Sequence, residues 1–490
     1  MKKVKKIGAL VLLAAMLMGL ASGCGEKAEE METITWYMPK PTADLSHQDN
    51  VERAANKIFN EKLGVNVKFR FFDTSSWEDK INLIISSGEE FDLCLTNSTT
   101  NRFDVNVTRG AFLPLNDLLD KYGPAIKAKV NDFAWEGATV DGNIYAIPGQ
   151  APYAVPKMYT FRKDLIDKYN IDYKSIKKIE DLEPYLKLIK ENEPGVTPLF
   201  ASATGTADDE ISDRYFETSI DCIRYDKEKD DFILITRDES WLKQYRVVKD
   251  YYNKGYIEKD AASKTDILTE TRMGKYAVIG GTGVYSDGSK SSDYYGFPCV
   301  ETLLGYNYIT TNSVRKVMTA VSRTSKHPEK AIQVLNLIWE DPNLSNLLAY
   351  GIEGEDYTIA SGEGTDEISV VPNTGDQLKW AIWHNWLGPL WDQWDSPWNS
   401  RESLMEMKER NEIAPQSPLL GFWIRQDNIK TEVAQLSAIY NESKPIFVTG
   451  SMDNFDDFVA KMEKRLIDAG ANTVIEAARE QYKEWKESNK

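Results

Sequence analysis

The fold follows from residues 33–95, TITWYMPKPTADLSHQDNVERAANKIFNEKLGVNVKFRFFDTSSWEDKINLIISSGEEFDLCL, because the spacing of the hydrophobic residues changes four times along this stretch. Residues 33–38 and 91–95 are short apolar runs and residues 65–71 alternate apolar with polar side chains, which is typical of strands. Apolar side chains recur every three or four residues over 51–63 and 77–85, which predicts two helices. The order strand–helix–strand–helix–strand predicts an α/β fold with a parallel sheet and right-handed crossovers.

Ligands of open parallel sheets bind beyond the carboxyl ends of the strands. The predicted strands end before residues 39–47, 73–77 and 96–102, and the last of these segments consists almost entirely of hydrogen-bonding side chains. An ordinary solvated loop accounts for that composition equally well. The ligand-binding candidates in this part of the chain are Trp36, Lys40, Trp77, Asn97 and Arg102.

A second α/β stretch follows Pro148-Gly149. Its patterns predict strands at 159–161 and 276–279, helices at 164–169, 180–192 and 240–253, a strand at 306–311 that returns to the first lobe, and terminal helices from 455 and from 472. The glycine-rich loop 280–283 lacks the spacing of a dinucleotide-binding fingerprint and indicates a close backbone approach. Tyr153, at the start of this stretch, and Tyr285, beside that loop, are further ligand-binding candidates.

Six of the 13 tryptophans lie between residues 380 and 398: Trp380, Trp383, Trp386, Trp391, Trp394 and Trp398. Asp, Asn, Gln and His side chains lie between them, and indoles beside such groups suit the apolar faces and hydroxyl rim of a sugar. Tryptophans at this spacing also pack helices onto a core, and we expect about half of them to do so. Trp383, Trp386 and Trp391, nearest the Gly388-Pro389 break, are the expected ligand contacts.

Residues 1–23 read as a secretory leader in which four lysines precede an apolar run from Ile7 to Leu20. The run ends in Ala21-Ser22-Gly23-Cys24, which resembles a bacterial lipobox, so Cys24 is the predicted lipid attachment site. An ordinary signal peptide with a chance cysteine is the alternative. Residues 24–32 are the expected lipid-anchored tether. The other three cysteines (Cys94, Cys222 and Cys299) are too few and too widely spaced for a disulfide framework.

Composition narrows the possible functions. A net charge of −17 opposes binding to nucleic acid and to anionic lipid. It also disfavours anionic sugars, unless Arg102 or Arg162 lines the site. Only three histidines are present, and the sequence lacks the nucleophile-elbow, phosphate-loop, zinc-protease and EF-hand motifs, so we expect no catalytic residues, no cofactor and no metal.

Two segments, Phe161–Tyr169 (FRKDLIDKY) and Ser325–Ala331 (SKHPEKA), together with the lipobox and the opening α/β lobe, resemble family 1 extracellular solute-binding lipoproteins of ABC importers. Tyr350–Tyr357 (YGIEGEDY) and the tail around 461–485 look like the Gram-positive subgroup with a C-terminal extension. The resemblance implies a two-lobe, type II periplasmic-binding-protein-like (Venus-flytrap) fold with extra C-terminal helices. Lobe 1 would comprise residues 33–149 and 305–345, and lobe 2 residues 150–304 and 346–490.

The resemblance also implies a function. The protein would be a monomer, lipid-anchored on the extracellular face of the cytoplasmic membrane, that captures an oligosaccharide or sugar derivative between its lobes and delivers it to an ABC permease. A surface glycoside hydrolase or lyase is an alternative, since carboxylates (Asp392, Asp395, Glu402 and Glu406) accompany the tryptophans. A binder of peptides or of another solute is the third hypothesis.

Overall fold

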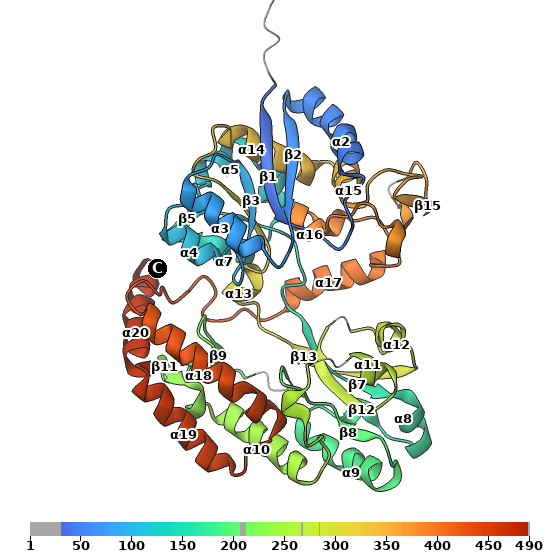
Figure 1. Ribbon diagram of the computed structural model, residues 1–490, viewed down its shortest axis with the longest axis vertical. Coiled ribbons are helices and arrows are strands. Elements are labelled where there is room, and N and C mark those ends of the chain that lie inside the picture. Colours follow the sequence, from blue (N-terminus) through green and yellow to red (C-terminus); the bar gives the residue numbers. More distant parts are fainter. Residues whose placement is uncertain (1–30, 206–211, 266–267, 284, 366, 489–490) are drawn as a thin grey trace, which may run out of the picture.

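The computed structural model describes residues 31–205, 212–265, 268–283, 285–365 and 367–488. The described chain forms two lobes, each built around its own sheet and its own hydrophobic core (Figure 1). The two-lobe α/β fold expected from the sequence is therefore confirmed.

Lobe 1 contains a five-stranded sheet in the order β2-β1-β3-β14-β6. The strands are β1 (Thr33–Pro39), β2 (Asn66–Phe72), β3 (Leu93–Thr96), β14 (Met318–Val321) and β6 (Ile147–Pro148). β1 pairs in parallel with β2 and with β3, as predicted, whereas β14 is antiparallel to β3. The helices of this lobe are α2 (Gln48–Leu63), α3 (Trp77–Ser87), α4 (Phe103–Thr108), α5 (Asn116–Tyr122), α6 (Pro124–Lys129), α7 (Asp132–Ala138) and α14 (Pro328–Glu340).

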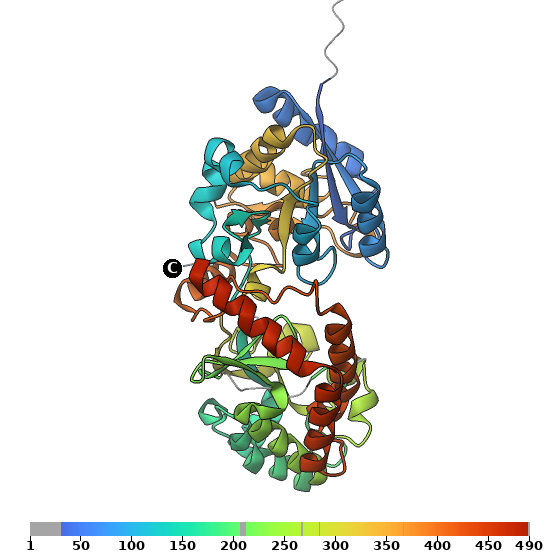
Figure 2. The same ribbon diagram turned by 90° about the vertical axis from the view of Figure 1, so that its left-hand side faces the viewer.

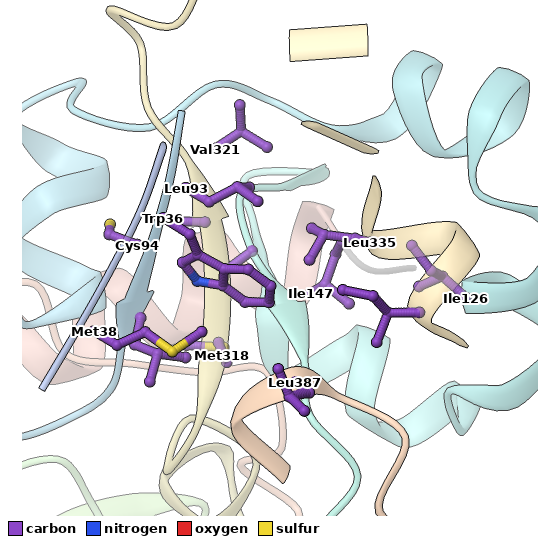
Figure 3. Packing of buried hydrophobic residues seen from close by; sticks show 14 of the residues in the cluster. Trp36, Met38, Leu93, Cys94, Ile126, Ile147, Met318, Val321, Leu335 and Leu387 are labelled. Atoms are coloured by element: carbon purple, nitrogen blue, oxygen red, sulfur yellow. The ribbon is translucent and has the colours of Figure 1, made fainter. Parts of the chain in front are cut away.

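The core of lobe 1 lies along this sheet. Figure 3 shows Trp36 among Met38, Leu93 and Met318, and all four side chains are buried. An indole removes about 150–250 Å² of surface from water, which at ~25 cal/mol per Å² stabilises the fold by several kcal/mol. The strand ends that were predicted to carry ligand contacts are therefore anchored in a dry, close-packed lobe.

Lobe 2 contains a four-stranded sheet in the order β13-β7-β12-β8 and a small antiparallel sheet β11-β10-β9. The strands are β7 (Pro156–Arg162), β8 (Thr197–Leu199), β12 (Tyr276–Thr282), β13 (Cys299–Tyr306), β9 (Tyr215–Glu217), β10 (Ile223–Asp226) and β11 (Asp231–Leu234). The principal helices are α8 (Lys163–Tyr169), α9 (Glu183–Asn192), α10 (Glu239–Asn253) and α12 (Ser289–Tyr295).

The C-terminal helices α18 (Lys430–Thr449), α19 (Phe455–Asp468) and α20 (Ala471–Ser488) pack onto lobe 2 beside α10 and β11 (Figure 2). The segment that leads into them also touches lobe 1. The Arg315 guanidinium, next to α13 (Thr311–Val314), lies 4.8 Å from the ring centre of Phe103 and 5.1 Å from that of Trp423. This pair of cation–π contacts ties the extension to lobe 1.

Three segments of the described chain cross between the lobes, around residues 149–155, 307–310 and 414–418. Their backbones are hydrogen-bonded to one another: Asn307 N–H donates to Val155 (3.1 Å), Ile309 N–H to Pro415 (2.8 Å) and Ser417 N–H to Ile309 (2.8 Å). The strand predicted at 306–311 is therefore wrong. Its apolar residues belong to the end of β13 and to a crossing segment, and β14 is the strand that returns to lobe 1.

Residues 342–413 contain α15 (Pro342–Tyr350), the hairpin β15 (Tyr357–Ser361) and β16 (Ser369–Pro372), α16 (His384–Leu387) and α17 (Arg401–Ile413). The sequence-based division assigned residues from 346 onward to lobe 2. In the structure, Leu348, Trp380, Ile382 and Leu387 belong to the core of lobe 1. Helical patterns locate helices but do not say which of two lobes buries their apolar side chains.

The turn after α16 generates a prediction about stability. Gly388 has a φ of 120°, and a Cβ added there would lie 2.2 Å from Nε1 of the buried Trp339. Gly388→Ala should therefore lower the free energy of unfolding by about 2–3 kcal/mol, from overpacking plus backbone strain. The matched control is Gly142→Ala, with a φ of 76° and open space around the added methyl, which should cost about 1 kcal/mol. Urea unfolding of both variants measures the difference, and equal costs would contradict the packing argument.

Candidate functional site

The six clustered tryptophans divide into buried and accessible groups. Trp380 lies in the core of lobe 1, and Trp391, 5% exposed, packs against Leu404 and Met407. Trp383 is 54% exposed and Trp398 is 42% exposed, whereas Trp386 and Trp394 are half-buried. This division agrees with the expectation that some of the six tryptophans pack into a core and do not contact a ligand.

Trp383 and Trp386 form a stacked indole pair with ring centres 6.0 Å apart and planes 19° apart. Trp386 packs against the core of lobe 1, which holds the pair in place while Trp383 faces solvent. The pair borders a crossing segment, because Gln150 N–H donates to the Gly388 carbonyl (2.8 Å) and Gly149 lies so close to the Asn385 carbonyl that no side chain would fit. Trp383, directly before α16, and Trp386 on it therefore form an accessible aromatic surface next to the crossing segment, and Figure 1 shows α16 within lobe 1.

Four of the predicted ligand contacts are buried and need correction. Trp36 is fully inside the core, Trp77 packs on Phe72 at the start of α3, and Trp391 anchors α17. Tyr153 is also buried, and its hydroxyl donates to the Gly149 carbonyl at 2.6 Å. Burial in close-packed cores keeps these side chains from a ligand, so they are structural residues.

The polar candidates at the strand ends bond mainly to their own loops. Asn97 accepts hydrogen bonds from the backbone N–H groups of Thr99 and Thr100, which shapes the turn after β3. Arg102 forms an ion pair with Asp104 at 2.7 Å. Lys40 is half-buried at the end of β1 and Tyr285 is half-buried in lobe 2. Asn97 and Arg102 therefore bond within the segment that follows β3 and not to the indole pair.

Arg162, which was considered for binding an anion, is also paired. Its guanidinium contacts Asp164 at 2.6 Å and the Gly274 carbonyl. The two arginines singled out from the sequence, Arg102 and Arg162, are thus neutralised by carboxylates two residues further along the chain.

Residues of α17 were missed by sequence reasoning. Asn411, which is buried, accepts hydrogen bonds from the N–H groups of Tyr153 (2.9 Å) and Ala154 (3.3 Å) and donates to the Ala151 carbonyl (2.8 Å). Ser403 and Arg410 are buried too. Buried polar side chains at i, i+7 and i+8 follow helical spacing, but in the sequence they resemble an exposed helix face.

His384 is a buried histidine at the start of α16. Its Nε2 lies 2.9 Å from Oδ1 of Asn346, which also accepts from the N–H of Trp394. Complete burial lowers the pKa of His384 to about 3, so the imidazole stays neutral at physiological pH. The residue therefore organises the tryptophan segment and does not act as an acid or base there.

Three of the four carboxylates that suggested an enzyme are bonded to other groups, and the fourth, Glu402, is exposed at the start of α17. Asp392 pairs with Lys129 at 2.6 Å, Asp395 accepts from Ser369 (3.0 Å) and from the Arg401 N–H (2.7 Å), and Glu406 pairs with Arg410. A hollow of about 450 Å³ lies between α6 and α17 and is bordered by Lys129, Gln150, Trp391, Asp392 and Lys408, among others. Its lining includes both cationic side chains (Lys129 and Lys408) and the anionic Asp392.

No group of three or more His, Cys, Asp or Glu side chains in the described ranges is arranged to hold a metal ion. Within those same ranges, no helix combines the length and the apolar character needed to cross a bilayer. Cys24 and the leader lie outside the described residues.

Comparison with known protein families identifies the family to which the two lobes belong. Residues 45–340, which include strands of both lobes, match the model described as bacterial extracellular solute-binding protein. The protein belongs to this family. Residues 418–487, which contain α18–α20, match a domain of unknown function (DUF3502). The resemblance noted in the sequence is therefore confirmed for the solute-binding family.

Relatives extend the match over the whole solute-binding protein. A carbohydrate ABC transporter substrate-binding protein of Streptococcus pneumoniae serotype 4 (strain ATCC BAA-334 / TIGR4) is 27% identical over 511 residues, covering 100% of both chains. The crystal structure of the N-glycan transport solute binding protein (NgtS) from Streptococcus pneumoniae has a TM-score of 0.79 at 24% identity, covering 94% of this chain and 100% of that one. An extracellular solute-binding protein from Bifidobacterium longum subsp. infantis has a TM-score of 0.63 at 15% identity, covering 93% and 99%.

The buried imidazole predicts a pH dependence of stability. The unfolded chain binds a proton at His384 below its ordinary pKa of about 6.5, whereas the folded protein does so only near pH 3. His384 therefore favours unfolding as the pH falls below 6.5, by about 2 kcal/mol between pH 7 and pH 5. Urea unfolding at both pH values should show a loss of stability on acidification that is smaller by this amount in His384→Gln. Equal losses in the two proteins would show that the imidazole is protonated in the folded state.

Proposed function

We propose that this solute-binding protein captures an oligosaccharide between its lobes and delivers it to the membrane permease of an ABC importer. The observation that carries the proposal is the indole pair on lobe 1 next to a crossing segment, in which Trp383 is exposed and stacks on the half-buried Trp386. The pneumococcal relative named as a carbohydrate ABC transporter substrate-binding protein supports it. So does the two-lobe architecture shared with NgtS.

The physical basis is stacking. A pyranose ring has apolar C–H faces, and Trp383 has about half of its surface free to cover one of them. Trp386 supports the outer indole from behind, so little conformational entropy is lost when a sugar binds. We expect micromolar affinity, about −8 kcal/mol, which allows both capture and release.

Closure of the lobes around the hydrogen-bonded crossing segments would enclose the ligand. A ligand that contacts both lobes favours the closed conformation by its differential affinity for it, and the closed pair of lobes would be what the permease recognises. In this mechanism the protein binds and releases an intact sugar, and no side chain acts as a catalyst.

We further propose that the protein is held at the extracellular membrane face through acylated Cys24. The support is the lysine-rich, apolar leader that ends in small residues before Cys24. Each buried acyl methylene contributes about 0.8 kcal/mol, so two or more chains give a stable anchor.

Metabolic labelling with a fatty-acid analogue tests the anchor. We expect the wild-type protein to carry the label and Cys24→Ser to lose it, because the thiol is the proposed attachment point. Cys299→Ser is the control, since that thiol is buried in lobe 2 and should leave the labelling unchanged. A labelled Cys24→Ser protein would place any acylation elsewhere.

Calorimetric titration of the detergent-solubilised full-length protein with oligosaccharides tests the capture function. We expect stoichiometric binding to at least one sugar, with Trp383→Ala weakening it by about tenfold or more through lost stacking. Trp398→Ala is the matched control, because it removes another accessible indole of the same segment, one that packs on Tyr350.

The outcomes separate the hypotheses. Equal loss in both tryptophan variants, or no loss in either, would place the sugar away from the indole pair. Chromatography of the sugar after titration detects cleavage, and accumulation of product would favour a hydrolase or lyase over a transport receptor.

A further inference from the structure

The face of α17 that points to lobe 2 carries Ser403, Glu406 and Arg410. These residues are spaced i, i+3 and i+7, so they share one side of the helix. Two contacts anchor α17. Leu404 and Met407 pack on Trp391 in lobe 1, and Asn411 is hydrogen-bonded to the crossing segment. The helix is thus a fixed part of lobe 1 that offers polar groups to its partner lobe.

Lobe 2 meets this face with α12 and the loop before it. Nζ of Lys290 donates to Oγ of Ser403 at 2.7 Å, and the Arg410 guanidinium reaches the Tyr285 carbonyl at 3.4 Å. Arg410 also lies over the ring of Tyr306, 5.7 Å from its centre. Figure 1 shows α12 on the side of lobe 2 next to α17, in agreement with these contacts.

The two cations are incompletely balanced. Arg410 is only 4% exposed, pairs with Glu406, and leaves its Nε buried without a hydrogen-bond partner. Lys290 is half-buried and, within the described residues, has no carboxylate at ion-pair distance; its ammonium donates to the neutral hydroxyl of Ser403. Burial lowers the pKa of Lys290, Glu406 raises it and Arg410 lowers it. One carboxylate thus serves two partly desolvated cations.

A desolvated cation is costly unless an anion or several acceptors compensate it. Lys290 and Arg410 both lie at this contact between the lobes, where the ring of Tyr306, 5.7 Å from the Arg410 guanidinium, offers an aromatic face that suits a sugar ring. We propose that Lys290 and Arg410 bind a carboxylate of the transported sugar, so that the substrate class is an acidic oligosaccharide. This inference rests on the proposed capture function and names its specificity.

The protein's net charge does not oppose this assignment. The total of −17 acts over the whole surface, and salt screens it beyond about 8 Å at physiological ionic strength. Charge-assisted hydrogen bonds at a partly buried pair of cations act at contact distance and are about twice as strong as neutral ones. Local cations therefore decide whether a carboxylate is accepted. Arg102, Arg162 and Arg410 each pair with a carboxylate, whereas within the described residues Lys290 has none at ion-pair distance.

The test uses the full-length protein in detergent and matched pairs of sugars: trigalacturonate with its methyl ester, and sialyllactose with lactose. We expect at least one acidic member to bind about tenfold or more tightly than its neutral counterpart. Lys290→Met should remove that preference and leave the neutral sugar nearly unaffected, and Lys290→Arg should retain it. Lys408→Met is the control, because it removes an exposed cation from a different face of α17.

Arg410→Gln should reduce the same preference. Since this buried residue also supports the fold, the half-buried Lys290 provides the deciding variant. Equal affinity for acidic and neutral members overturns the inference and leaves the capture function standing. An equal loss for both sugars in Lys290→Met also overturns it, because that result marks the bond to Ser403 as a structural bridge. Failure of every carbohydrate to bind overturns the capture function itself.

Discussion

The structure depends on hydrogen bonding of the backbone where the chain crosses between the lobes. Polar backbone groups buried at such a place must find partners, since each unpaired group costs about 1–3 kcal/mol. The chain supplies them from the crossing segments themselves, through the bonds of Ile309 with Pro415 and Ser417, and from the amide of Asn411. Because Asn411 belongs to α17, the crossing segment helps to fix the position of that helix, together with the packing of Leu404 and Met407 on Trp391.

That constraint explains why the accessible aromatic and cationic groups lie near the crossing. The residue after α16, Gly388, accepts a hydrogen bond from Gln150 of the crossing segment, Gly149 packs closely against α16, and α17 is bonded to the next residues of the same segment. The indole pair on one helix and Ser403 and Arg410 on the other are therefore held in a fixed relation on lobe 1. Lys290, Tyr285 and Tyr306 approach α17 from lobe 2. A change in the angle between the lobes would move these three residues and leave the stacking surface intact.

The sequence predicts the opening sheet of lobe 1 well, because its periods are local and unambiguous: α2, α3 and the parallel pairing of β1 with β2 and β3 all appear. It predicts the site less well. Trp36 and Trp383 are both indoles near polar residues, yet one is enclosed by a sheet covered on both faces and the other is 54% exposed. That difference depends on residues hundreds of positions away, such as Met318, which lies beside Trp36. α17 was missed because most of its buried residues are polar.

Neutral and charged recognition have different physical requirements at this site. Stacking on Trp383 needs only an accessible apolar face, and it discriminates poorly among sugars, since every pyranose offers one. A half-buried ammonium and a buried guanidinium that share one carboxylate, Glu406, discriminate strongly, because only a ligand with a negative charge supplies the second anion. Trp383, which discriminates poorly among sugars, lies next to the crossing segment, whereas Lys290 and Arg410, which would discriminate by charge, lie where the lobes touch. Affinity for a sugar would then be set on lobe 1, and the choice among sugars would be made as lobe 2 approaches.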